Sequence, residues 1–203
     1  MIGFWTEFHL VPDSRQWWRF LEVWGLNLQS LPEGRFHSLL SYSLVHGNLG
    51  HLLTNVILLI LFGHRLGRLV STRSLITLAV GSVLFGGACQ LFVNQYSPDL
   101  LLVGASPIAF AWGVAWMTLD PDARMLGMPF KLLAPAIVFA SLALAIGSTL
   151  PSLTNSALSE IWRTSHASHF GGALVGYLWG ILWTTRKPVT LEALQRQRAS
   201  REP

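Results

Sequence analysis

The stretch Leu102–Gly113 reads LVGASPIAFAWG and places one hydroxyl group at the entrance of a long apolar segment. Ser106 follows the small residues Gly104 and Ala105, which leave the backbone free to turn. The next residue, Pro107, suits the first position of a helix because its missing N–H would find no partner there. Ser106 is therefore predicted to be the N-cap of a helix, a position that serines commonly fill. The surrounding chain decides whether it has a further role.

The composition is that of a membrane protein. Hydrophobic residues make up 51% of the 203 residues and charged residues only 12%. About 20 apolar residues cross a bilayer, and several runs approach this length with few charges inside them. The formal charge of +4 does not indicate nucleic-acid binding, because the basic residues lie beside the ends of the apolar runs, where they orient membrane proteins. The single cysteine, Cys89, is interpreted as core packing.

These runs predict an all-α helix bundle with five transmembrane helices. Residues 1–35 contain neither an apolar run of spanning length nor the pattern of a signal peptide. We divide the chain into this N-terminal segment, a transmembrane domain over residues 36–184 and a basic tail over residues 185–203. The expected spans are residues 51–63, 74–92, 100–119 or 106–119, 132–150 and 166–183.

The N-terminal segment is rich in aromatic residues and predicts a helix that lies in the membrane interface, where Trp side chains are favoured. Asp13 or Ser14 would cap its start, and Pro32 with Gly34 would end it. Its apolar face would comprise Trp17, Phe20, Leu21, Trp24, Leu28 and Leu31.

The basic residues predict the orientation of the bundle. Ten of the fourteen lie in the stretches after the first, third and fifth spans. Basic loops remain in the cytoplasm, so these stretches and the C-terminus are expected on the cytoplasmic side. The protein itself is expected in the cell membrane, which in a bacterium is the inner membrane. His46, His51 and Ser106 then lie near the outer face, and the N-terminus lies on that side too.

Polar side chains within the first span mark a candidate site, because such groups are costly inside a membrane. His51 and Asn55 lie four residues apart and share a helix face, and His46 precedes them. A purely structural interpretation is that Asn55 bonds across helices and that the histidines pair with loop carbonyls. These residues alone leave both interpretations open.

Small residues in two other spans favour a close approach. In the last span, His169 is followed by Gly172 and Gly176, which lie beneath it on one face. In the third span, Ala109 and Gly113 form a similar face beneath the serine. Small faces allow helices to approach closely. We therefore expect the two faces to pack together and to bring the histidine to the serine.

The residues gathered in this way have the chemistry of a hydrolase. A serine hydroxyl becomes a strong nucleophile when an adjacent base takes its proton, and a neutral imidazole is the usual base. Ser106 and His169 can form such a pair. His51, Asn55 and the serine N–H could donate hydrogen bonds to an oxyanion. No Asp or Glu lies in any predicted span, so the pair would be a dyad without a carboxylate.

A second histidine of the last span, His166, leaves two alternatives to consider. It competes with His169 as the base, and we interpret it as a loop residue at the rim of the site. Together with His51, the two histidines could also form a zinc site. Neither a carboxylate nor a thiol joins them, so no metal is expected.

With these elements in this order, the chain resembles the rhomboid intramembrane serine proteases over about residues 34–183. The motifs are HGNLGHLLTN at 46–55, GAS at 104–106 and SHFGGALVG at 168–176. The resemblance implies cleavage of single-pass transmembrane substrates near the outer face of the lipid bilayer, without a metal or cofactor. It implies a nucleophile at Ser106, a base at His169, oxyanion donors at His51 and Asn55, and a site lined by His46, Gly104, Pro107, Phe110, Gly172 and Gly176.

Four features depart from the family pattern. Pro107 replaces the glycine that usually follows the serine, and because the serine keeps its N–H and hydroxyl, activity is expected to survive. Phe110 replaces a tyrosine and keeps a ring that can stack on the imidazole. The family's Trp–Arg pair aligns with His37 and Ser38, which leaves only Arg35 nearby and predicts a looser first outer loop. The family's first span has no counterpart, either because the chain starts further upstream or because this is a five-span variant.

Two other classes of function would make different demands on the sequence. A rhomboid-like pseudoprotease would bind client transmembrane helices without cutting them, and it would need none of the costly polar groups of the predicted site. A small transporter would need an inverted repeat or acidic residues within the spans, and the sequence has neither. The sequence thus favours an intramembrane serine protease, with the pseudoprotease as the alternative.

Overall fold

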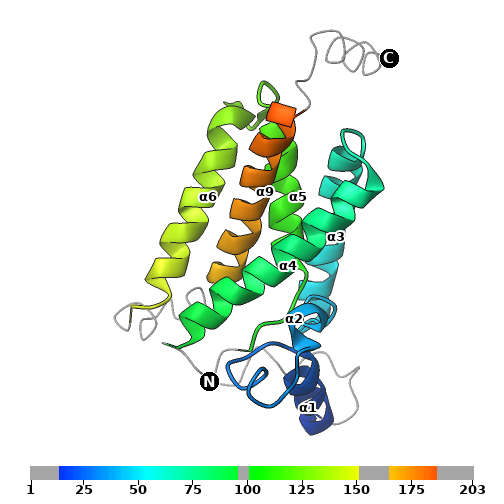
Figure 1. Ribbon diagram of the computed structural model, residues 1–203, viewed down its shortest axis with the longest axis vertical. Coiled ribbons are helices and arrows are strands. Elements are labelled where there is room, and N and C mark those ends of the chain that lie inside the picture. The colour runs from blue at the N-terminus through cyan, green and yellow to red at the C-terminus, as the bar shows by residue number, and fades with distance from the viewer. Residues whose placement is uncertain (1–13, 96–100, 151–164, 187–203) are drawn as a thin grey trace.

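The computed structural model describes residues 14–95, 101–150 and 165–186 and is mostly helical (Figure 1). A short hairpin of strands β1 (Arg124–Met125) and β2 (Met128–Pro129) precedes the helix α6. The helices are α1 (Ser14–Trp24), α2 (Ser38–Ser41), α3 (Leu49–Gly67), α4 (Thr72–Asn94), α5 (Ser106–Leu119), α6 (Phe130–Gly147) and α9 (His166–Arg186).

The five predicted spans correspond to α3, α4, α5, α6 and α9. Three of them, α3, α4 and α6, are long and apolar enough to cross a membrane. The helix α5 is apolar but shorter, with 14 residues, and α9 has 21 residues. The predicted class, an all-α membrane protein, is confirmed. The predicted basic tail lies almost entirely outside the described residues.

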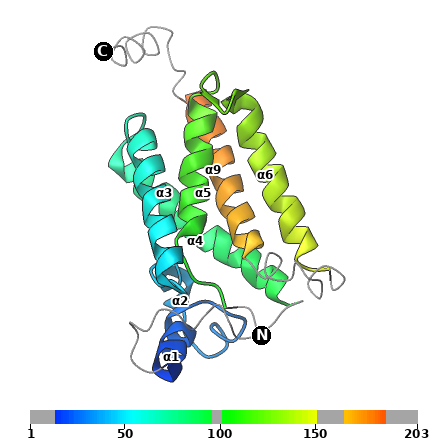
Figure 2. The same ribbon diagram turned by 180° about the vertical axis from the view of Figure 1, so that it is seen from behind.

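The helices α5 and α9 form the centre of the bundle (Figures 1 and 2). α9 packs against α4, α5 and α6, whereas α3 packs against α5. The helices α3, α5 and α9 all begin at the same end of the bundle, where α1 and α2 also lie (Figure 1). The first turns of three helices are therefore brought together, and these turns carry the polar residues that the sequence singles out.

Glycines on α9 allow its backbone to touch the backbone of α5. A Cβ atom at Gly172 would collide with the main chain of Pro107, and one at Gly176 would collide with the main chain of Ala111. Pro107 and Ala111 are four residues apart and share one face of α5. This row of contacts runs down from the first turn of α5 and sets the closest approach of the two helices.

The prediction that Ala109 and Gly113 of α5 face α9 is wrong. Gly113 faces α3 and not α9, because a Cβ at this position would lie 3.1 Å from Cε2 of Phe62. Two residues along a helix correspond to a rotation of about 200°. The row that starts at Ala109 therefore points away from the row that starts at Pro107. The close approach was predicted correctly, but the residues of α5 that make it were not.

The helix α1 is shorter than predicted. It ends at Trp24, so Leu28 and Leu31 lie beyond it, and the prediction of one continuous helical face is wrong. The backbone of Leu26 instead pairs with that of Leu102, with N···O distances of 3.0 and 2.8 Å. These two bonds take the Leu26 N–H and carbonyl out of any helix and hold the N-terminal segment against the chain that leads into α5.

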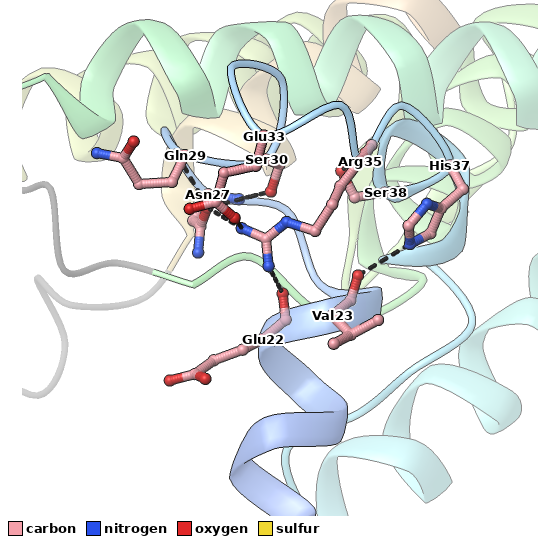
Figure 3. A network of polar contacts seen from close by, with 9 residues as sticks. All are labelled: Glu22, Val23, Asn27, Gln29, Ser30, Glu33, Arg35, His37 and Ser38. Atoms are coloured by element: carbon pink, nitrogen blue, oxygen red, sulfur yellow. Dashed lines mark hydrogen bonds and ion pairs between the residues drawn. The ribbon is translucent and has the colours of Figure 1, made fainter.

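Side chains from the loop before α2 cap the end of α1 (Figure 3). Arg35 Nη1 donates to the carbonyl of Glu22 at 2.7 Å, and Nε2 of His37 lies 3.0 Å from the carbonyl of Val23. The last carbonyls of a helix have no partner within it, and these side chains supply one. Arg35 and His37 thus connect the loop to α1 although the family's Trp–Arg pair is missing.

Candidate active site

Ser106 opens α5. Gly104 has a φ of +112°, a conformation that favours glycine, and this allows the chain to turn into the helix. Ala105 occupies the N-cap position and Ser106 is the first helical residue. The prediction that Ser106 caps the helix is therefore wrong by one residue. No side-chain capping bond forms at this end of α5, and the serine hydroxyl bonds to α9 instead.

The partner of that hydroxyl is His169, in the first turn of α9. Its Nε2 lies 2.8 Å from Oγ of Ser106. The ring of Phe110 stacks on the imidazole, with centroids 4.6 Å apart and planes inclined by 11°. Phe110 is one turn beyond Ser106 on the same face of α5. One helix thus presents both the hydroxyl at the edge of the imidazole and the ring on its face.

His51 and Asn55 on α3 lie against the turn before the serine. A Cβ at Gly104 would lie 2.7 Å from Nε2 of His51 and 3.7 Å from Nδ2 of Asn55. Asn55 is buried and donates one amide hydrogen to the carbonyl of His51 at 2.9 Å. An Asn amide carries two such hydrogens. The second one can serve a ligand held above Gly104, and any side chain at that position would block it.

His46 and Asn48 lie just before α3 and contact its first turn. Asn48 caps the helix by accepting the backbone N–H of His51 at 2.8 Å. The ring of His46 meets that of His51 edge to face, with centroids 5.1 Å apart. Burial lowers the pKa of His46, and the neighbouring His51 lowers it further, which favours the neutral ring. His46 therefore contacts the candidate site through the ring of His51.

The prediction that His166 is a loop residue at the rim of the site is wrong about the loop. It is the first residue of α9 and is buried, and its ring meets that of His169 edge to face at a centroid distance of 6.1 Å. It lies behind the imidazole that bonds to Ser106. Among the residues that the structure describes, no group of three or more His, Cys, Asp or Glu side chains could hold a metal ion.

Two buried amides on α4 escaped prediction from the sequence. Gln90 and Asn94 are 2% and 0% exposed, and Gln90 Nε2 donates to Asn94 Oδ1 at 2.8 Å. Gln90 Oε1 accepts the backbone N–H of Ser168, the residue before His169, at 3.3 Å. The signal was present, since polar side chains inside an apolar run are costly. The rule that singled out Asn55 applies to these amides as well.

Tyr42 was not predicted either, and here the sequence carries no signal that would have selected it. Its carbonyl accepts the N–H of Gly104 at 2.8 Å, and its buried hydroxyl donates to the carbonyl of Val83 on α4 at 2.7 Å. A buried tyrosine hydroxyl usually requires such a partner. Tyr42 therefore fastens the turn before Ser106 to α4.

Together, these contacts bring a serine hydroxyl against an imidazole, beside groups that can donate hydrogen bonds. The Ser106 hydroxyl can pass its proton to the imidazole of His169. The side chains of His51 and Asn55 face the turn before it, and the first N–H groups of α5 bring the positive end of the helix dipole. The arrangement suits a reaction in which a hydroxyl attacks a carbonyl carbon and negative charge develops on its oxygen.

The comparison with known families agrees with this geometry. A model of the Rhomboid domain matches residues 33–186, which is more than half of the 203-residue chain. The matched stretch runs from the loop that caps α1 to the end of α9, and it contains every residue of the candidate site. No curated protein matches the chain. The chain therefore belongs to the rhomboid family of membrane proteins, whose members are generally serine proteases.

Proposed function

We propose that this protein is an intramembrane serine endopeptidase in which Ser106 is the nucleophile and His169 is the general base. The observation that carries the proposal is the distance of 2.8 Å between Ser106 Oγ and His169 Nε2. A general base must lie within hydrogen-bond reach of the proton that it takes. A serine that served only to start a helix would need neither this partner nor the donors beside it.

In the first half of the reaction, His169 Nε2 takes the hydroxyl proton as Ser106 Oγ attacks the carbonyl carbon of the scissile peptide. The tetrahedral intermediate collapses when the C–N bond breaks, and His169 returns the proton to the leaving amine. The acyl group remains on Oγ. In the second half, a water molecule gives its proton to His169 and attacks the acyl carbon. Oγ leaves and recovers the proton, which restores both side chains.

The oxyanion of each intermediate is proposed to bind on the α3 side. Nε2 of His51 and the second amide hydrogen of Asn55 face the turn at Gly104, and the Ser106 N–H lies at the positive end of α5. Donors of this kind gain strength as the charge develops, so removal of one costs about 10²-fold to 10³-fold in rate. His51 therefore has a donor role that is distinct from the basic role of His169.

The orientation of the base has to come from packing, since no Asp or Glu lies in any predicted span. The stacked ring of Phe110 restricts rotation of the imidazole on one face. The buried His166 meets it at an edge. These contacts would supply the orienting role that a carboxylate has in a serine-protease triad.

The proposed substrates are single-pass transmembrane proteins that approach through the bilayer. Apolar side chains of α3 and α6 are exposed, among them Ile57 and Phe139, as expected of helices that face lipid. The charge pattern places the site near the outer face and the C-terminus in the cytoplasm. The proposed location is the cell membrane and, in a bacterium, the inner membrane. Substrate helices that unwind easily are favoured, because attack by Ser106 needs an accessible peptide carbonyl.

The rival function is a pseudoprotease that binds client helices without cutting them. It shares the family, the fold and the lipid-facing surface, so those features do not separate the two. The pairing of Ser106 with His169 and the donors on α3 favour the protease, because binding alone does not require costly polar groups within a membrane.

Cleavage in a bilayer tests the proposal. The full chain is reconstituted in liposomes with a single-pass reporter whose transmembrane helix contains residues that destabilise it. Wild-type protein is expected to cut the reporter, and Ser106→Ala and His169→Ala are each expected to abolish cleavage while the protein stays folded. A wild-type protein that binds the reporter and leaves it intact, under conditions in which a conventional rhomboid cuts it, would establish the pseudoprotease.

A further inference from the structure

The helix α4 contacts both residues that flank the Ser106–His169 pair, and it does so at Gly86. A Cβ at Gly86 would lie 2.9 Å from the carbonyl oxygen of Ser168 and 3.1 Å from Cβ of Pro107. Ser168 precedes the proposed base, and Pro107 follows the proposed nucleophile. A single residue of α4 therefore limits how closely α4 approaches both α5 and α9 at this level.

A second residue of α4 reaches the same point on α9. Gln90 lies one turn beyond Gly86 on the same face, and its Oε1 accepts the N–H of Ser168 at 3.3 Å. Its Nε2 donates to Asn94 at 2.8 Å, which fixes the orientation of the amide. Gln90 and Ser168 are both buried. The backbone of Ser168 thus meets α4 through its N–H and through its carbonyl.

The backbones of α4 and α9 are in direct contact here. A Cβ at Gly171 would lie 2.7 Å from Cα of Gly86, closer than two such atoms can approach. Helices that meet through glycines leave no side chain between them that could adopt another rotamer. The separation of α4 and α9 is therefore set by the main chains themselves, two residues after His169.

We propose that Gly86 and Gln90 are positioning residues that hold His169 at hydrogen-bond distance from Ser106. The proposal rests on the proposed function of this pair. A dyad without a carboxylate depends on the placement of the α9 backbone to aim its imidazole. A displacement of about 1 Å in such a geometry can cost about 10²-fold in rate, so the contacts at Ser168 govern activity even though α4 does not touch the reacting atoms.

The same contact explains how Pro107 fits where the family usually has glycine. Cβ and Cγ of the proline lie 3.1 and 3.4 Å from the position that a Cβ of residue 86 would take. The space that a side chain at position 86 would fill is used by the ring of Pro107. Proline at 107 and glycine at 86 therefore form a complementary pair in this chain.

Two alanine substitutions on α4 provide the test. Gly86→Ala adds a methyl group against Ser168 and Pro107. Gly81→Ala adds the same methyl group to the same helix, but its nearest neighbour would be Val175 Cγ1 at 3.9 Å, an ordinary contact. In the liposome assay, kcat of Gly86→Ala is expected to fall about 10²-fold with KM within about twofold of wild type. Gly81→Ala should match wild type, and equal kcat values for the two variants would overturn the proposal.

A milder variant guards against a simple folding failure. Gln90→Met keeps the length of the side chain and removes the acceptor for the Ser168 N–H. It is expected to lower kcat about tenfold, the value of one neutral hydrogen bond of about 1.4 kcal/mol, at an unchanged KM. A kcat equal to that of wild type would show that the amide has no part in placing His169.

A readout without turnover separates this inference from the proposed function. Nitrogen NMR of histidine-labelled protein reports the hydrogen bond at His169 Nε2, with the signal assigned from a His169→Gln sample. Ser106→Ala and Gly86→Ala are both expected to shift this signal, and Gly81→Ala is not. If wild-type protein cuts nothing, the protease proposal fails and this spectrum still tests the role of α4. An unchanged signal in Gly86→Ala would refute that role.

Discussion

The two sides of α5 are packed in different ways. Toward α9, the contact runs from main chain to main chain, as at Gly176, where a Cβ would collide with the backbone of Ala111. Toward α3, large rings fill the space, and a Cβ at Gly113 would meet the ring of Phe62 at 3.1 Å. Backbone contacts cannot adjust without moving a helix, whereas a ring can rotate or shift. The α9 side is therefore rigid and the α3 side can adapt.

This difference matches the roles proposed for the two helices. The proposed base, His169, is on the rigid side, where a small displacement breaks its bond to Ser106. The proposed donors, His51 and Asn55, are on α3, most of whose apolar stretch is not buried within the bundle. A base must be aimed at a single proton, whereas donors must receive a carbonyl that arrives with each substrate. The predictions below test this division, from the largest expected effect to the smallest.

Asn55→Ala tests the donor side. The substitution removes a proposed oxyanion donor and is expected to leave the dyad distance intact, because among the described residues the Asn55 amide bonds to its own helix and faces Gly104. We expect kcat to fall about 10²-fold to 10³-fold and labelling of Ser106 by a small fluorophosphonate to persist at a reduced rate. The measurement is initial cleavage rate in liposomes over a range of reporter densities. A rise in KM with an unchanged kcat would mean that Asn55 serves substrate binding instead.

Gly176→Ala and Gly113→Ala compare the two sides with the same added methyl group. At Gly176 the methyl meets backbone atoms of Ala111, so overpacking should lower the free energy of unfolding by about 1–3 kcal/mol. At Gly113 it meets the Phe62 ring, which can yield, and the better helix propensity of alanine, worth about 1 kcal/mol, offsets the strain. Thermal unfolding in detergent measures both. Equal losses of stability would contradict the contrast between a rigid and an adaptable side.

Phe110→Leu tests how far stacking aims the base. The ring lies 4.6 Å from the imidazole centroid, and aromatic pairs contribute about 0.5–1.5 kcal/mol beyond their burial. If the backbone of α9 does most of the aiming, kcat should fall by no more than about tenfold, the rate equivalent of that energy. Phe110→Tyr serves as the matched control and should retain the wild-type rate. Complete loss of activity in Phe110→Leu would make the ring, and not the helix packing, the main constraint.

Pro107→Gly restores the residue usual in the family and should have the smallest effect. The proline ring fills the space over Gly86 and restricts the unfolded chain, so its removal is expected to cost about 0.4–1 kcal/mol of stability with little change in kcat. Unfolding and cleavage rates measured on the same preparation decide this. A large gain in rate would show that Pro107 restrains the enzyme.

Hydropathy and residue spacing predicted the positions of all five long helices and the meeting of His169 with Ser106. Local signals were sufficient here, because apolar length and motif order are properties of the chain itself. The face of α5 that meets α9 was not predictable in this way. Ala109 and Gly113 are as small as Ala111, and only the assembled bundle shows which row faces which neighbour.

Other features depended on contacts between distant parts of the chain. The helix α1 stops at Trp24 because the Leu26 backbone pairs with Leu102, 76 residues away by number (102 − 26). The role of Gly86 required the positions of Ser168 and Pro107 on two other helices. Gln90, by contrast, could have been selected from the sequence, since a buried amide in a span is as costly as the Asn55 that was selected.

The central claim is that His169 activates the hydroxyl of Ser106, and a fluorophosphonate probe tests it without knowledge of any substrate. Full-length protein in liposomes is treated with the probe, digested and analysed by mass spectrometry. The account predicts one label on Ser106 in the wild type and none at that residue in His169→Ala, although both proteins unfold at similar temperatures. Failure of the wild type to label at Ser106, or equal labelling of the two proteins, would contradict it.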